Sequence, residues 1–295
     1  MSAKSIEVLR PGLTAGLLGL AFSGLLAGCA SPRMASADVS DTVGVGSKSE
    51  IRRLVPAQQL ERTAAQQFEA LKEEARKKGA LLPPSHPTSE KLVAMANRLK
   101  PYALSWNGDA ARWRWEVVVL KSNQLNAFCM PGGKIAFYTG LIEKLKLDDD
   151  EIAAVMGHEM AHALREHTRD RIAKSQLTDM GASIVSELLG FGQLGRQALG
   201  YGTQLLGLKF SRDDEKEADL VGLDISARAG YDPRAALSLW RKMKEANKGA
   251  PPEWLSTHPS GSTRMEEISM VLPRVLPLYA KAIGKAVEDL PDRDL

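Results

Sequence analysis

Apolar residues recur at helical spacing in the first part of the chain with a clear periodicity. From Leu60 to Leu71 they stand three or four residues apart, and Gly79 follows a turn rich in Lys and Arg. This pattern predicts a helix over 56–79, because residues so spaced share one helical face. A proline-rich break follows, and a second helix is predicted over 88–99.

The pattern changes to short apolar runs near the middle of the chain. Their β-branched and aromatic residues predict three strands, which occupy 113–120, 126–129 and 134–138. A Pro-Gly-Gly turn joins the last two strands, and helical spacing returns from residue 139. We therefore expect an α+β fold, a mostly helical domain with a small antiparallel sheet.

The N-terminal segment has the pattern of a secretory signal. An uncharged run over 12–27 is shorter than the ~20 residues that a membrane span needs. It ends in Leu26-Ala27-Gly28-Cys29, which resembles the lipobox of bacterial lipoproteins, in which the Cys carries the lipid. We expect a signal peptide over 1–28, lipidation of Cys29 and a membrane tether. Because the next residue is Ala30 and not Asp, the outer membrane, facing the periplasm, is the favoured location. A soluble secreted protein is the alternative.

The rest of the chain divides by composition. We expect a flexible linker over 29–55, one folded domain over 56–285 and a tail over 286–295. The chain of 295 residues is 44% hydrophobic and 25% charged, as globular proteins are. Its 39 Lys and Arg against 36 Asp and Glu give a formal charge of +3 without a basic block, which argues against a nucleic-acid partner.

Candidate chemistry lies in residues 158–162, which read His-Glu-Met-Ala-His. Asp148 and Glu151 predict a capping box at the start of this helix. His158 and His162 are four residues apart and project from one face, where they can bind one zinc ion. Glu159 is rotated by about 100° from His158, so it can reach a water on that metal as general base and then acid. The pattern predicts a zinc-dependent peptide hydrolase.

A catalytic zinc needs a third protein ligand. A His six residues beyond His162 is excluded, because Thr168 stands there. Glu215, on a later helix, is a candidate, with Asp219 one turn on to orient a ligand histidine. An acidic helix start also complements the helix dipole, so the spacing alone leaves Glu215 open. Glu217, rotated by about 200° from Glu215, is predicted to face solvent.

The remaining histidines and Cys129 carry weaker signals. His86 lies in the proline-rich break and is predicted to be a loop residue. His167 falls half a turn from His158 and is predicted to lie on the surface. His258 precedes a proline, where a plain turn residue is common. Cys129 is predicted to be a small buried hydrophobe.

Several further short segments occur in a fixed order. They are Asn126-Ala127-Phe128, Pro131-Gly132-Gly133, Gly157–His162, Ser211–Asp219, Gly230–Pro233 and Trp254–Pro259 with Arg264. Together they resemble the family of zinc metallopeptidases that includes HtpX and the CAAX prenyl protease. The resemblance covers about 56–275 and is nearest to the bacterial lipoprotein, periplasmic branch.

The resemblance implies a zincin-like metalloendopeptidase with one zinc ion. It makes His158, His162 and Glu215 the metal ligands, with Asp219 beside them. It places His258 close to the metal, where it either stabilises the oxyanion or occupies the open zinc position at rest.

The resemblance also implies how substrate binds and what it is. The strand with Asn126, Ala127 and Phe128 is expected to pair with an extended substrate, an ordinary core strand being the alternative. Residues 177–209 are either a lid or ordinary helical packing, and Arg264 either supports the site or forms a plain salt bridge. The expected substrates are unfolded or misassembled envelope proteins. The alternative function is a zinc-stabilised chaperone that works with outer-membrane assembly machinery.

Overall fold

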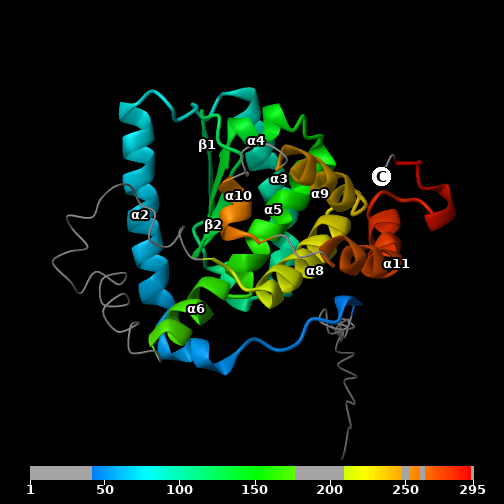
Figure 1. Ribbon diagram of the computed structural model, residues 1–295, viewed down its shortest axis with the longest axis horizontal. Coiled ribbons are helices and arrows are strands. Elements are labelled where there is room, and N and C mark those ends of the chain that lie inside the picture. The colour runs from blue at the N-terminus through cyan, green and yellow to red at the C-terminus, as the bar shows by residue number, and fades with distance from the viewer. Residues whose placement is uncertain (1–41, 177–208, 248–252, 260–262, 294–295) are drawn as a thin grey trace, which may run out of the picture. The chain divides into compact units, whose positions relative to one another are not determined.

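The computed structural model describes residues 42–176, 209–247, 253–259 and 263–293 (Figure 1). Its α-helices are α2 (Ala57–Lys77), α3 (Pro87–Ala103), α4 (Thr139–Lys144), α5 (Asp149–Leu164), α6 (His167–Gln176), α8 (Arg212–Arg228), α9 (Ala235–Ala246), α10 (Glu253–Thr257) and α11 (Arg264–Ala282). Its strands are β1 (Glu116–Leu120), β2 (Ala127–Met130) and β3 (Lys134–Tyr138). The predicted α+β class is confirmed, and so are the helices predicted over 56–79 and 88–99.

The three strands form a mixed sheet in the order β1-β3-β2. β2 and β3 are an antiparallel hairpin, with Ala127 opposite Phe137. β1 runs parallel to β3, with Glu116 opposite Lys134. The prediction of an antiparallel sheet is therefore wrong for β1. β2 runs opposite to β1 but lies at the other edge of the sheet. β3 then returns between them, in the direction of β1.

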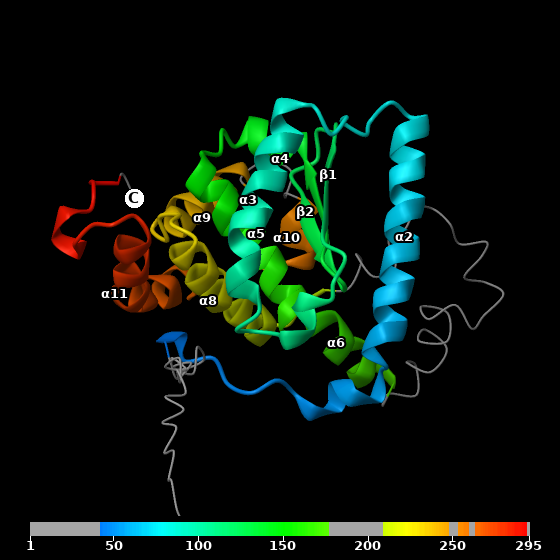
Figure 2. The same cartoon turned by 180° about the vertical axis from the view of Figure 1, so that it is seen from behind.

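Alternate residues of the strands face two different cores. In β2, Ala127 and Cys129 join the core that contains α5, whereas Phe128 and Met130 join the core under α2. Both views show α2 on one side of the sheet and α5 on the other (Figure 2). This period of two is what a strand buried on both faces requires. Cys129 is buried, as predicted, and burial raises its pKa well above the usual value.

Helix α5 packs on α8 at unusually close range. A Cβ atom added to Gly157 would lie 2.6 Å from the Ser226 Oγ and 2.8 Å from the carbonyl oxygen of Gly222. Only glycine permits this approach. The predicted capping box at the start of α5 is confirmed, since Asp148 Oδ1 accepts from the Glu151 amide at 2.8 Å.

The segment before α2 packs on the domain. Val43, Val45 and Val55 are buried, and Arg52 donates from Nε to Glu166 Oε2 at 2.8 Å. The linker predicted over 29–55 is therefore wrong for its last part, because these valines find apolar surface to cover. Likewise Arg293, in the predicted tail, forms ion pairs with the start of α5.

Other predictions fall outside the described residues. These are the signal peptide over 1–28, the lipidation of Cys29 and the lid or helical packing over 177–209, of which only residue 209 is described. All three stay predictions. Among the described helices, none combines the length and apolar content that a membrane crossing requires. His86, predicted to be a loop residue, immediately precedes α3. It caps this helix, since its Nδ1 accepts a hydrogen bond from the Thr88 amide at 3.2 Å.

Candidate metal centre

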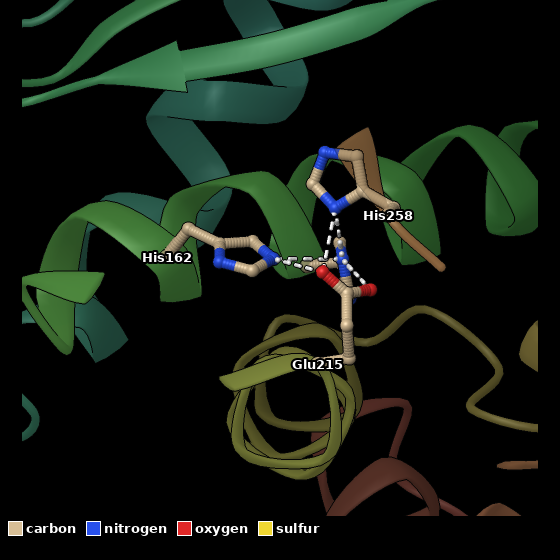
Figure 3. A group of neighbouring side chains, drawn as sticks. His162, Glu215 and His258 are labelled. Atoms are coloured by element: carbon tan, nitrogen blue, oxygen red, sulfur yellow. Dashed lines mark hydrogen bonds and ion pairs between the residues drawn. The ribbon is translucent and has the colours of Figure 1, made fainter. Parts of the chain in front are cut away.

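Four buried side chains each bring one donor atom to a common point. His158 and His162 come from α5, Glu215 from the first turn of α8, and His258 from the residue after α10. The four donors lie within 4.8 Å of one another. Figure 3 shows His162, Glu215 and His258 directed at the same point from these three elements. The structure therefore brings together the predicted metal ligands and adds His258 to them.

The spacing of these donors fits one zinc ion. The Nε2 atoms of His158 and His162 are 3.0 Å apart, and His258 Nδ1 lies 3.3 Å from His158 Nε2. Glu215 Oε1 lies 3.4 Å from His162 Nε2 and 3.0 Å from His258 Nδ1. Ligands of a tetrahedral zinc at about 2.0–2.1 Å are separated by about 3.3 Å, and imidazole nitrogens and carboxylate oxygens are both common zinc ligands.

Asp219 and Arg264, which we name the deep flank, hold this cluster from the side of α8 and α11. Asp219 Oδ1 lies 3.0 Å from His158 Nδ1. Arg264 donates from Nη2 to Asp219 Oδ1 at 2.8 Å and from Nη1 to Glu215 Oε2 at 2.6 Å. Burial opposes ionisation of Asp219, but Arg264 and His158 outweigh it and lower its pKa. Arg264 thus supports the site and is more than an isolated salt bridge.

Glu159 lies beside the four donors without belonging to them. Its Oε1 accepts from the indole Nε1 of Trp254 at 2.6 Å and lies 3.6 Å from His258 Nε2. Trp254 also stacks on His258, with ring centroids 4.8 Å apart. Burial opposes the protonated form of His258, but the carboxylates of Glu159 and Glu215 outweigh it and raise its pKa.

A second group of side chains contacts the cluster through His162, and we name it the outer flank. It consists of Arg165, His167 and Glu217. The prediction of a surface His167 is wrong: it is 4% exposed, and its Nδ1 lies 2.9 Å from His162 Nδ1. Helix α5 ends at Leu164 and Glu166 adopts a left-handed conformation, with a φ of 62°, so the helical projection from His158 no longer applies to His167.

The prediction that Glu217 faces solvent holds only in part. Its side chain is 32% exposed, and its Oε2 lies 3.3 Å from His167 Nε2. Arg165 donates from Nε to the same Glu217 oxygen at 2.8 Å. Glu217 points away from Glu215 on α8, as the spacing predicted, but α5 and α6 cover that direction.

A cleft connects the donor cluster to β2. Asn126, Ala127 and Phe128 line it together with Glu159 and His162. β2 pairs with β3 on one side, and no other strand of the described residues pairs with it, so its cleft side is a sheet edge. The predicted substrate strand therefore borders the donor cluster.

Residues 92–271 match peptidase family M48, which is more than half of the chain and includes all four donors. The chain belongs to peptidase family M48. Its OMA1 relatives are named metalloendopeptidases, and M48 metalloproteases depend on zinc. The conclusion agrees with the donor set, which on its own fits one zinc ion.

Relatives within M48 carry two kinds of name. The mitochondrial metalloendopeptidase OMA1 of Schizosaccharomyces pombe is 35% identical over 196 residues, covering 65% of this chain and 56% of that protein. That of Arabidopsis thaliana is 37% identical over 167 residues, covering 56% and 33%. The β-barrel assembly-enhancing protease of Escherichia coli is 29% identical over 160 residues, covering 50% and 32%. The chain thus spans about a third to somewhat over half of the length of these relatives.

These relatives correct two predictions. They support the M48 family of zincins but not the HtpX or CAAX prenyl protease branch of the resemblance. The predicted location at a bacterial outer membrane is contradicted, because the OMA1 relatives from plants, fungi and animals are named as mitochondrial. That location rested on the lipobox-like motif ending at Cys29, on Ala30 after it and on the resemblance to the bacterial lipoprotein branch.

Sequence patterns missed part of this M48 site. The bond from Trp254 to Glu159 had a usable signal, because Trp254 stands four residues before His258, about one helical turn away. Phe210, whose ring stacks on His162 at 3.9 Å, had none. Its contact depends on how the chain before α8 returns to α5.

Proposed function

We propose that this chain is a zinc metalloendopeptidase in which His158, His162 and Glu215 hold the metal. The observation that carries the proposal is the buried four-donor cluster, which adjoins both Glu159 and an open strand edge. A binding site for a purely structural zinc needs neither a neighbouring carboxylate nor a cleft.

The proposed reaction is the hydrolysis of a peptide bond. When bound, zinc supplies a Lewis acid that polarises the scissile carbonyl and activates water. Glu159 takes a proton from the attacking water and passes it to the leaving amine. Trp254 holds the Glu159 carboxylate in place through its indole N–H at 2.6 Å. Burial of Glu159 keeps its charge away from bulk water.

We propose that substrate binds as an extended chain along β2, next to Asn126, Ala127 and Phe128. Main-chain pairing to a strand edge recognises backbone groups and tolerates many side chains. A folded protein does not offer such a strand, so unfolded or misassembled polypeptides are the proposed substrates. The names of the relatives, a metalloendopeptidase and an assembly-enhancing protease, are consistent with this class.

For His258 we propose the resting position on the metal. Its Nδ1 lies 3.0 Å from Glu215 Oε1 and 3.3 Å from His158 Nε2, at the spacing of a fourth ligand. This favours the second of the two roles implied by the resemblance. His258 then has to leave this place when substrate binds.

The central test replaces the proposed base. We expect Glu159→Gln to lower cleavage of unfolded casein by at least ~100-fold, because the amide cannot accept the proton. Zinc content should stay at one ion per chain, since Glu159 is not among the donors. Equal cleavage by both forms contradicts the proposal. No cleavage by either, with equal suppression of aggregation by both, supports a zinc-stabilised assembly factor instead.

A second test concerns the third ligand. We expect Glu215→Gln to lower the zinc content of the purified protein well below one ion per chain, because a neutral amide is a poor zinc ligand. Metal analysis after dialysis measures this, and Asp213→Asn, at an exposed position of the same helix turn, is the matched control. Unchanged zinc in Glu215→Gln would show that Glu215 is not a ligand.

A further inference from the structure

The second ring nitrogen of His162 has a buried partner of its own. His162 Nδ1 lies 2.9 Å from His167 Nδ1, and His167 Nε2 lies 3.3 Å from Glu217 Oε2. Arg165 fixes Glu217 with a 2.8 Å hydrogen bond from Nε. The outer flank is therefore a continuous chain of polar contacts that ends on a proposed metal ligand.

The chemistry of these groups gives this chain a direction. An ionised carboxylate only accepts hydrogen bonds, so His167 Nε2 carries the hydrogen that faces Glu217. A histidine that binds a metal through Nε2 carries its hydrogen on Nδ1, so His162, as the proposed ligand, donates from Nδ1 to His167 Nδ1. Its Nε2 is left with a bare lone pair that faces the other donors.

The deep flank leaves the Nε2 lone pair of His158 directed at the cluster in the same way. Asp219 accepts from His158 Nδ1 at 3.0 Å, which leaves His158 Nε2 with its lone pair toward the cluster. Each histidine of α5 thus has an acceptor on its far nitrogen. One acceptor is a carboxylate, and the other is a histidine backed by a carboxylate.

Resting on the proposed zinc site, we propose that His167, oriented by Glu217, is a positioning residue that fixes the tautomer and direction of the metal ligand His162. Phe210 stacks on the His162 ring at 3.9 Å and limits its tilt, while His167 holds its far nitrogen. Partners of this kind on a ligand histidine raise its basicity and restrict its rotation, and losing one lowers metal affinity by ~10–100-fold.

The test measures metal binding in the Glu159→Gln background, where cleavage plays no part. Zinc affinity is measured by competition with a chromophoric chelator, and the cobalt-substituted protein is compared by visible absorption. We expect His167→Ala to bind zinc ~10–100-fold more weakly and to shift the cobalt bands. His167→Asn, which keeps an acceptor oxygen near the position of Nδ1, should recover most of the affinity and the parent spectrum.

The control is His86→Ala, which removes a histidine and a helix cap far along the chain from the site. Circular dichroism of the metal-free proteins shows whether each variant folds. If His167→Ala does not fold, Glu217→Ala tests the same chain of contacts. Affinity and spectrum unchanged in folded His167→Ala, or lowered equally in His86→Ala, overturn the proposal. If the protein with Glu159 intact binds zinc but does not cleave casein, the proposed activity is refuted and this inference still stands.

Discussion

The two flanks of the metal centre do similar work by different means. In the deep flank, Arg264 is buried and bridges two carboxylates, Asp219 and Glu215. In the outer flank, Glu217 is partly exposed and acts on His162 only through His167. Arg165 extends that flank further, because its Nη2 donates to the Gly46 carbonyl in the segment before α2.

The difference shows where electrostatics matter most. Charges removed from water interact more strongly, but each depends on its partner, because an unpaired buried charge is very unfavourable. Partly exposed charges can be solvated instead when a partner is lost. The deep flank should therefore govern folding as well as metal binding, whereas the outer flank should adjust the metal centre with little effect on the fold.

The largest effect is expected from Arg264→Met. It leaves Asp219 and Glu215 buried without a cation, and breaking such a pair costs about 3–5 kcal/mol. Urea unfolding of the metal-free protein measures the loss of stability. Arg274→Met, an exposed position on the same helix, is the matched control and should change stability by less than ~0.5 kcal/mol. If both variants lose a similarly small free energy of unfolding, the deep flank does not govern folding as we expect.

A smaller loss is expected from Gly157→Ala. The added Cβ meets the Ser226 Oγ and the Gly222 carbonyl, so α5 and α8 must separate. Overpacking of this kind costs about 1–3 kcal/mol, and the shift should also weaken zinc binding, because His158 is the next residue. Gly46, whose carbonyl accepts from Arg165 of the outer flank, has no atom within 4 Å of an added Cβ, so Gly46→Ala should be tolerated. Equal stability of the two variants in thermal unfolding would show that the contact between α5 and α8 at Gly157 tolerates a Cβ.

The smallest effect concerns Glu166, which ties Lys48 and Arg52 of the N-terminal segment to Arg169 of α6. Burial opposes its ionisation, but these three cations outweigh it and lower its pKa. Its stabilising contribution is thus present above the unfolded value near ~4.3 and is lost as pH falls through the lower folded value.

We therefore expect Glu166→Gln to lower stability by about 1 kcal/mol at pH 7. The difference in free energy of unfolding between the variant and the unaltered protein should become smaller as the pH falls below ~4. Urea unfolding at a series of pH values checks this, with exposed Glu143→Gln as the control. A gap that stays constant down to pH ~3 would show that the Glu166 carboxylate is not responsible.

Local geometry explains what could be predicted without a structure. The helix that carries His158 and His162, its capping box and the buried face of each strand depend on residues close in the chain. A fixed 3.6 residues per turn or alternation along a strand converts their spacing directly into position. Even Glu215 and Asp219 share a face for this reason, although spacing alone left the role of Glu215 open.

The sequence by itself thus determined the chemistry: two histidines and a glutamate on one helix, and a glutamate and aspartate on another. Tertiary structure alone decided which of the other groups reach that centre. His258 comes from 100 residues beyond His158. His167 reaches the centre because α5 ends before it and Glu166 adopts a left-handed conformation. The parallel pairing of β1 with β3 is of the same kind. These contacts depend on how distant segments pack, and no local repeat distance encodes that.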